Sequence, residues 1–302
     1  MFLGDYFQAS ETFFRLESMN NWSRAFYHYI ATCCMFADEQ YDKAGMEFHQ
    51  IPSILDRKRE LGGRLLPNEM FAERKIKRWK EKAQTILSQG SYLPPHLQWM
   101  AQSPAQQTQQ EFLKDRYLLL DGELLKQVVV VNPLWELVYL WNGIPQLSSE
   151  MLNSMKQQLQ STLDQQLQLA QPQHSDIAIL RVISGAVQRE LNDFTAAEKC
   201  FQAAVALDSR VSEDRWVIPY ALYELAVLHC FRLQKAGSEE DAIQARSLIK
   251  RAEQYFRRGA QPDNSDTPPT SDEADHHDWE NRLHIRCQLL LEKVDELHPS
   301  AD

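Results

Sequence analysis

The sequence has little glycine, with only 10 residues in 302. Proteins built from strands and tight turns use glycine where the backbone must adopt conformations that other residues disfavour, so the scarcity argues against a strand-based fold. The sequence also lacks an apolar run of the roughly 20 residues that span a bilayer, and its N-terminus shows no basic region followed by an apolar one. We therefore expect a soluble chain that is not secreted and has no transmembrane segment.

An excess of positive charge is missing as well. The chain carries 32 Lys and Arg against 42 Asp and Glu, a formal net charge of -10. General nucleic-acid binders need a basic excess to contact phosphates, so we expect no nucleic-acid partner. The five cysteines show no paired spacing of the zinc or redox kind, which favours buried free thiols in a reducing compartment. They are Cys33, Cys34, Cys200, Cys230 and Cys287.

Motifs that carry chemistry are absent from the sequence. It has no glycine-rich phosphate loop, nucleophile elbow or metal-binding histidine helix. His276 and His277 precede Asp278, but the pattern fixes no second ligand set nearby. His28, His229 and His284 lie within expected helices, where packing or hydrogen bonding is their ordinary role. We predict a protein that is not an enzyme, with no catalytic, cofactor or metal site.

A helical hairpin organises the rest of the chain, between Leu180 and Asp208. Its apolar and small residues recur at helical spacing on either side of a polar turn around Glu190 to Asp193. Small residues such as Ser184 and Ala197 are expected where the two helices cross, because short side chains allow close approach. This spacing fits a tetratricopeptide repeat with a turn one residue longer than usual.

The same pattern occurs 153 residues earlier. Subtracting positions gives 153 for Phe194 and Tyr41, for Ala197 and Ala44, and for Phe201 and Phe48, so the copies share the lengthened turn. The full set on the earlier copy is Tyr27, Ile30, Ala31, Cys34, Tyr41, Ala44, Phe48 and Ile51. A looser third copy runs from Leu222 to Ala252 around an expected loop, Leu233 to Glu240. We predict an all-α fold, a tetratricopeptide-like helical-hairpin repeat array (α-solenoid).

Three regions are expected along the chain: a helical repeat array over 1–258, a disordered acidic insert over 259–277, and a C-terminal capping helix and tail over 278–302. Between Leu55 and Leu66, charge and Gly62-Gly63 predict a flexible connection. Helices outside the hairpins are expected at Met1–Met19, Glu69–Leu87, Glu111–Val131, Pro133–Asn142 and Ser148–Ala170.

Six cations lie between Arg74 and Lys82 on the expected helix Glu69–Leu87, interleaved with Trp79 and other apolar residues. Clustered cations beside an aromatic residue suit an anionic surface or an acidic partner, with Lys75, Arg78 and Lys82 as contacts. Alternatively, Trp79 faces the core and the charges keep a solvated helix soluble. We expect glutamine at these three positions to change folding little.

Four ordered blocks carry a resemblance to a known family. They read NNWSRAFYHYIATCCMFADEQYDKAGMEFHQIP followed by LLPNEMFAERKIKRW, then NPLWELVYLWNGI from Asn132 and WVIPYALYELAVLHC from Trp216. They resemble the tetratricopeptide repeat protein 39 and fungal inclusion body clearance protein family, whose name also carries a mitochondrial outer-membrane association. The chain looks like the C-terminal half of a family whose members are about twice as long.

The resemblance implies a non-enzymatic helical-repeat protein of cytoplasm and nucleus, linked to lipid-droplet proteins and to clearance of misfolded-protein inclusions. Its expected partners are proteins, including lipid-droplet proteins, with peripheral contact to lipid droplets or the mitochondrial outer membrane. The alternative is a peripheral lipid- or sterol-handling protein. A large cavity lined by Tyr27, Phe36, Trp135 or Trp141 would favour that alternative, whereas a solid core with an open groove would favour a scaffold.

Overall fold

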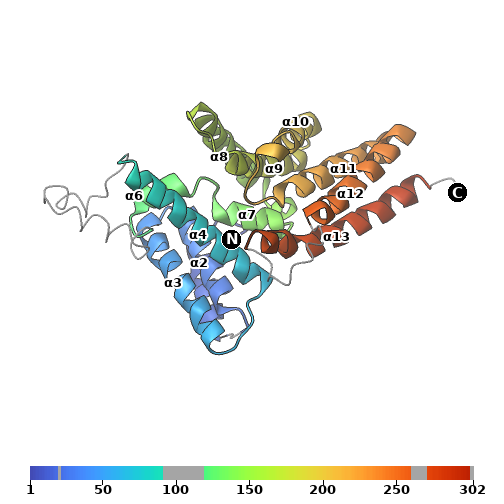
Figure 1. Cartoon of the computed structure of the whole chain (residues 1–302). Coiled ribbons are helices and arrows are strands. Elements are labelled where there is room, and N and C mark those ends of the chain that lie inside the picture. The colour runs from blue at the N-terminus through green and yellow to red at the C-terminus, as the bar shows by residue number, and fades with distance from the viewer. Residues whose placement is uncertain (20–21, 91–118, 260–270, 300–302) are drawn as a thin grey trace, which may run out of the picture. The chain divides into compact units, whose positions relative to one another are not determined.

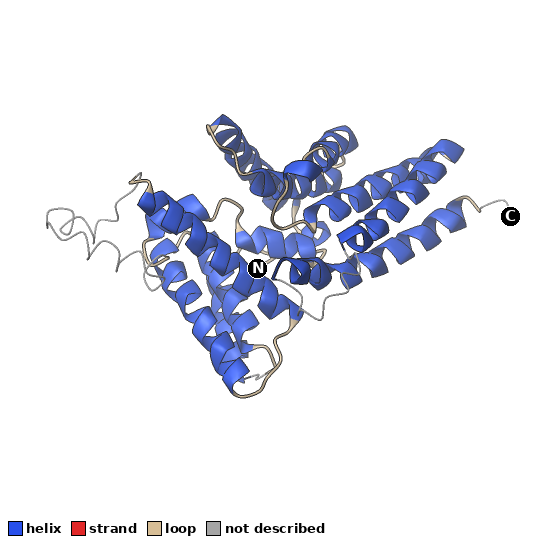
Figure 2. Cartoon of the chain, viewed as in Figure 1, coloured by secondary structure: helices blue, strands red, loops and turns tan. Residues whose placement is uncertain are grey.

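A computed structural model describes residues 1–19, 22–90, 119–259 and 271–299, with side chains from 256 to 278 left undescribed. Helices account for the regular structure of these residues, and they include no strand (Figure 2). The predicted all-α fold is therefore confirmed. The chain divides into two compact units, Met1–Val138 (unit 1) and Tyr139–Asp302 (unit 2).

Unit 1 is built around the first predicted hairpin. Its helices are α1 (Tyr6–Met19), α2 (Arg24–Ala37), α3 (Tyr41–Glu60), α4 (Pro67–Ser88), α6 (Gly122–Val128) and the first part of α7 (Pro133–Leu140). Helix α2 packs against α1, α3 and α4. Four buried aromatic rings meet in the centre, with ring centroids 5.8 Å apart for Tyr29 and Phe48, 6.4 Å for Tyr29 and Phe71, and 5.0 Å for Phe48 and Trp79.

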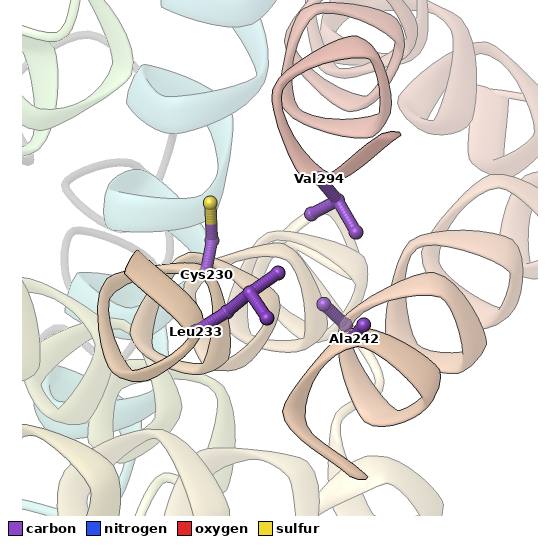
Figure 3. Packing of buried hydrophobic residues seen from close by; sticks show 5 residues of the cluster. Cys230, Leu233, Ala242 and Val294 are labelled. Carbon is purple, nitrogen blue, oxygen red and sulfur yellow. The ribbon is translucent and has the colours of Figure 1, made fainter. Parts of the chain in front are cut away.

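Unit 2 contains the other two hairpins. Its elements after α7 are the 3-10 turn η2 (Ile144–Gln146), α8 (Ser149–Gln168), α9 (His174–Glu190), α10 (Phe194–Val205), the 3-10 turn η3 (Asp208–Arg210), α11 (Val217–Ala236), α12 (Glu239–Gly259) and α13 (Ser271–Leu297). From α8 to α13 each helix packs against the next (Figure 1). Figure 3 shows residues from three helices in one apolar cluster: Cys230 and Leu233 of α11, Ala242 of α12 and Val294 of α13.

The turns of the first two hairpins have the same backbone geometry. Glu39 and Asn192 both have positive φ, 60° and 62°, and their positions differ by 153. Each turn is closed by equivalent hydrogen bonds: Gln40 N donates to Met35 O at 3.0 Å, and Asp193 N donates to Gln188 O at 2.9 Å. The register inferred from the sequence therefore extends to individual backbone bonds.

Small buried residues lie where the paired helices approach each other. Ala44 and Ala197 are both fully buried, as the register predicts. On α9, however, the closest approach is at Gly185, where a Cβ atom would collide with the ring of Phe201. Ser184, which was expected at the crossing, is only half-buried, because the helical rotation turns the neighbouring Gly185 toward α10.

The third hairpin has a shorter connection than the sequence indicates. The expected loop from Leu233 to Glu240 is largely helical, and only Gly237 and Ser238 separate α11 from α12. Gly237 ends α11 in the left-handed conformation, φ 63°, and its N–H donates to Leu233 O at 2.8 Å. A glycine in this position reverses the chain within two residues.

Several other boundaries differ from the sequence-based expectations. Helix α3 continues to Glu60 through half of the predicted flexible connection, supported by an ion pair between Arg59 and Asp56 one turn earlier. Helix α13 starts at Ser271, so its first turns lie within the range expected to be a disordered insert. Of the expected helix Glu111–Val131, α6 covers Gly122–Val128, and the part before residue 119 lies outside the described residues.

Candidate functional site

Helix α4, which carries the predicted contact residues, begins beside a buried carboxylate. Pro67 occupies its first turn, where a missing N–H is tolerated, and Glu69 accepts a hydrogen bond from Leu66 N at 2.9 Å. Glu69 is fully buried and also accepts from Lys58 Nζ at 2.6 Å and from Ser23 Oγ at 3.2 Å. A single carboxylate therefore joins the starts of α2 and α4 to the end of α3.

The predicted contact residues Lys75, Arg78 and Lys82 lie on one face of α4, since their spacing of three and four residues repeats once per turn. Lys75 is 5% exposed and pairs with Glu136, itself 2% exposed, at 2.6 Å. Arg78 is 8% exposed, and Lys82 is half-buried. The structure thus places Lys75 within the packing of unit 1, where its charge is already matched.

This burial changes how the anionic-surface prediction has to be tested. Removing one partner of a buried ion pair leaves an uncompensated charge and costs about 3–5 kcal/mol. The expectation that glutamine at all three positions leaves folding intact therefore needs correction at Lys75. The sequence could not reveal this, because Glu136 lies on a different helix, α7, far along the chain. Trp79, by contrast, is buried in the core as the alternative interpretation expected.

A pocket that the sequence did not indicate lies where three elements of unit 1 end or begin. Its volume is about 370 Å³, and it lies between the start of α2, the last turns of α3 and the segment leading into α4. The lining residues are Arg24, Ala25, Ile54, Arg57, Lys58, Leu61, Gly63 and Glu69. The available signal was the run Arg57, Lys58, Arg59, which falls in the last turn of α3.

The pocket is rich in positive charge. Glu69 is its one lining carboxylate, against three lining cations. Arg24 is exposed and lies 3.5 Å from Glu17, a long ion pair. Arg57 is exposed, and its guanidinium forms no ion pair with any residue that the structure describes. Two arginine side chains are therefore exposed to solvent at the pocket, and Ala25 and Ile54 line it with apolar surface.

The thiols are poorly suited to nucleophilic chemistry. Burial raises the pKa of Cys34 to about 12 and that of Cys287 to about 12. Burial also raises the pKa of Cys33 well above its usual value, and that of Cys200 less strongly. A thiol reacts as its thiolate, so these side chains are held in the unreactive form near neutral pH. All five cysteines are free.

The helical histidines pair with carboxylates, as expected for packed or hydrogen-bonded residues. His28 is buried, with Nδ1 2.9 Å from Glu17 and Nε2 3.1 Å from Glu47. His229 lies 2.7 Å from Asp241, and His284 lies 3.0 Å from Glu253. Among the described residues, no group of three or more His, Cys, Asp or Glu side chains is arranged to hold a metal ion. The side chains of His276 and His277 lie outside the described residues.

Unit 2 has a buried charged network of its own. Glu224 on α11 pairs with Arg189 on α9 and accepts a hydrogen bond from the Tyr139 hydroxyl at 3.2 Å. Burial, reinforced by the Glu224 charge, raises the pKa of Tyr139 well above its usual value. The network therefore joins α7, α9 and α11 as a structural element.

In the parts of the chain that the structure describes, no helix combines the length and apolarity needed to cross a bilayer.

These features define a class of protein: an all-α repeat protein in which the first two hairpins share one turn geometry. Comparison with known proteins is more specific. The family described as Iml2/Tetratricopeptide repeat protein 39 matches residues 1–191, and the chain belongs to this family. No solved structure matches the chain.

Three similar proteins with assigned names come from fungi. The chain is 24% identical to the inclusion body clearance protein iml2 of Aspergillus fumigatus over 246 residues, 75% of this chain and 29% of the relative. It is 23% identical to the protein of the same name in Neosartorya fischeri over 244 residues, again 75% and 29%. It is also 23% identical to the iml2 of Aspergillus niger over 245 residues, 75% and 30%. The chain thus spans less than a third of the length of these relatives.

Proposed function

We propose that this protein is a non-enzymatic scaffold that takes part in clearing misfolded-protein inclusions through protein–protein interaction. The observation that carries the proposal is the family match over residues 1–191, together with relatives named inclusion body clearance proteins. Stacked helical hairpins present extended surfaces that suit protein partners. The described residues also offer no cluster that suggests a metal-dependent reaction.

Packing of the aromatic side chains supports a scaffold over a sterol-handling protein. Phe36 packs edge-on against Tyr41 with ring centroids 5.0 Å apart, and Trp141 packs against Trp279 at 5.6 Å. These rings are engaged by neighbouring protein groups, and none of them lines the 370 Å³ pocket of unit 1.

The proposal extends to location and partners. The protein acts in cytoplasm and nucleus, with lipid-droplet proteins among its partners, and associates peripherally with lipid droplets or the mitochondrial outer membrane. Of the three predicted contact residues Lys75, Arg78 and Lys82, contact with an anionic surface runs through Arg78 and Lys82, because Lys75 is buried in its ion pair with Glu136. Vesicle binding by Arg78→Gln and Lys82→Gln variants, with Lys75 kept and folding checked by melting, tests that contact. Binding equal to wild type would remove these two side chains from it.

The scaffold role is tested in fungal cells that lack their own inclusion body clearance protein. A fluorescent aggregation-prone reporter is induced and then shut off, and the half-time of inclusion loss is measured with and without this chain. We expect the chain to shorten the half-time. Ala197→Leu, which overpacks the second hairpin, should abolish the effect, whereas Gln202→Leu on the exposed side of the same helix should preserve it.

The proposed dependence of clearance on lipid droplets is tested in a separate experiment. The same reporter is followed in cells unable to form lipid droplets, where the expected result is that the chain no longer accelerates clearance. Acceleration that persists without droplets would contradict the droplet step and leave a scaffold working elsewhere. No acceleration in either strain would contradict the clearance role itself.

A further inference from the structure

The pocket of unit 1 combines charge and apolar surface in a way that the scaffold role does not use. Three cations and one carboxylate line it, a local excess of two positive charges on a chain whose net charge is -10. The carboxylate is already occupied, because Glu69 accepts bonds from Ser23, Lys58 and Leu66 N. The remaining attraction for an anion therefore comes from Arg24 and Arg57.

Arg24 and Arg57 differ from the nearby Arg59 in their ion pairs. Arg59, two residues after Arg57, is held by Asp56 at 2.9 Å and by Glu73 at 2.6 Å. Glu73 and Asp56 raise its pKa, chiefly through the hydrogen bond with Glu73. Arg57 has no comparable ion pair among the described residues, and Arg24 has only the 3.5 Å approach to Glu17. Their guanidinium groups can be recruited without breaking a buried pair.

The chemistry of the lining favours one class of ligand. Guanidinium groups bind phosphate through paired, charge-assisted hydrogen bonds, and Ala25, Ile54 and Leu61 supply apolar contacts beside them. A volume of about 370 Å³ lies near the lower end of the range for small-molecule sites, about 300–1,000 Å³. The start of α2, where Ser23 precedes Arg24, adds the partial positive charge of a helix N-terminus, which favours an anion.

We propose that this pocket binds a phosphate monoester carried on a small apolar group. A phosphate monoester of this kind occurs both in soluble organic phosphates and in the headgroup of a phospholipid such as phosphatidic acid. The site is independent of the scaffold role, since it lies at the ends of helices and not on the predicted partner surface of α4.

A simpler explanation exists for Arg57 and Lys58. Basic residues in the last turn of a helix offset the partial negative charge at its C-terminus and contribute about 0.3–1 kcal/mol. That role would show itself in stability alone. Ligand binding would show itself in affinity, so one substitution separates the two.

The test uses the full chain and 1-naphthyl phosphate as the probe, with binding measured by titration calorimetry at low salt. We expect Arg57→Gln to weaken binding about tenfold or more, as the loss of one charge-assisted bond implies. The double variant Arg24→Gln with Arg57→Gln should weaken it further. Lys77→Gln, which removes an exposed cation from α4, is the matched control and should bind like the wild type. Circular dichroism of each variant confirms that the fold is retained.

Two further arms identify the source of the phosphate. Vesicles of phosphatidylcholine with and without phosphatidic acid are tested for cosedimentation, and 1-naphthol replaces the phosphate in calorimetry. Binding to phosphatidic acid vesicles that Arg57→Gln reduces indicates a lipid headgroup, and binding of 1-naphthyl phosphate alone indicates a soluble ligand. Either result supports the site. The proposal is overturned if neither probe binds, if 1-naphthol binds as tightly as its phosphate, or if Arg57→Gln binds as well as Lys77→Gln.

Discussion

The first and second hairpins have equivalent core residues and differ in the length of their second helix. Offset by 153 residues, Ala44 and Phe48 on α3 correspond to Ala197 and Phe201 on α10, and all four are fully buried. Helix α10 ends at Val205, whose counterpart on α3 is Pro52. Helix α3 nevertheless continues for two more turns to Glu60, and this extension carries the Ile54, Arg57 and Lys58 side chains of the pocket. The repeated core provides the scaffold, and the unrepeated extension provides the candidate ligand site.

Each unit also contains a buried ion pair between two helices, Lys75–Glu136 in unit 1 and Arg189–Glu224 in unit 2, and breaking either one should have the largest effect. Lys75→Met leaves Glu136 without its ammonium partner, and Arg189→Met does the same to Glu224. We expect each to cost about 3–5 kcal/mol in urea unfolding followed by circular dichroism. The loss at Arg189 should be at the lower end, because the Tyr139 hydroxyl still donates to Glu224.

Exposed lysines on the same or an adjoining helix serve as controls for that comparison. Lys77→Met on α4 and Lys199→Met on α10 should change stability by less than about 0.5 kcal/mol. The double variant Lys75→Met with Glu136→Met should recover much of the lost stability, since it removes both charges. If Lys75→Met behaves like Lys77→Met, the pair does not stabilise unit 1.

Overpacking the shared core should have a smaller effect that is equal in the two hairpins. Ala44→Leu and Ala197→Leu add bulk at equivalent crossings, and we expect each to cost about 1–3 kcal/mol. The measurement is the shift in the urea midpoint, with Gln202→Leu as the exposed control on α10. A large cost at one alanine and none at the other would break the equivalence of the hairpins.

Alkaline pH should distinguish the hairpins through Cys34, whose counterpart in the second hairpin is Val187. Burial raises the pKa of Cys34 from 9.0 to about 12, so above pH 9 the thiol ionises in the unfolded chain but not in the folded one. Its contribution to stability is therefore complete below pH 9 and is lost as the pH rises toward 12. The maximum slope for one group is about 1.4 kcal/mol per pH unit.

The variant Cys34→Val copies the second hairpin and removes this dependence. The difference in unfolding free energy between wild type and Cys34→Val, measured at pH 8 and at pH 10, should shift in favour of the variant at the higher pH. Parallel stability profiles for the two proteins would show that Cys34 ionises equally in the folded and unfolded chains.

The turns should show the smallest effect. Glu39 and Asn192 both occupy the left-handed region, but asparagine tolerates it better than glutamate does. We expect Glu39→Gly to stabilise the protein by up to about 1 kcal/mol, and Asn192→Gly to change it by a few tenths. Thermal melts of the two variants measure the contrast. A destabilised Glu39→Gly would mean that its side chain contributes more than its backbone strain costs.

The sequence was sufficient for the hairpins because their information is local. Apolar spacing and one shared turn predict both copies, and the equal offsets of Ala44 and Phe48 from their counterparts predict the register. The same local spacing predicted Ser184 at the helix crossing, one residue away from Gly185, which lies there in the structure. Neighbouring positions on a helix differ by only about 100° of rotation, so the pattern did not distinguish between them.

The candidate site depends on contacts that no local pattern encodes. The burial of Lys75 requires Glu136, which lies on α7. The pocket requires the start of α2, the end of α3 and the buried Glu69 to meet, and the charged stretch after Leu55 reads as a connection when taken alone. A cluster of cations in sequence does not show which charges are exposed, because that depends on which helix covers them.

The convergence of three helix ends on Glu69 also links ligand binding to folding by mass action. The pocket exists only while α2, α3 and α4 are docked, so a ligand bound there favours the folded form of unit 1 over any opened form. At a hundred times its dissociation constant, such a ligand would add about 2.7 kcal/mol to the stability of that unit. Occupancy would then appear as protection of the amide protons near Ser23, Lys58 and Leu66 from exchange with solvent.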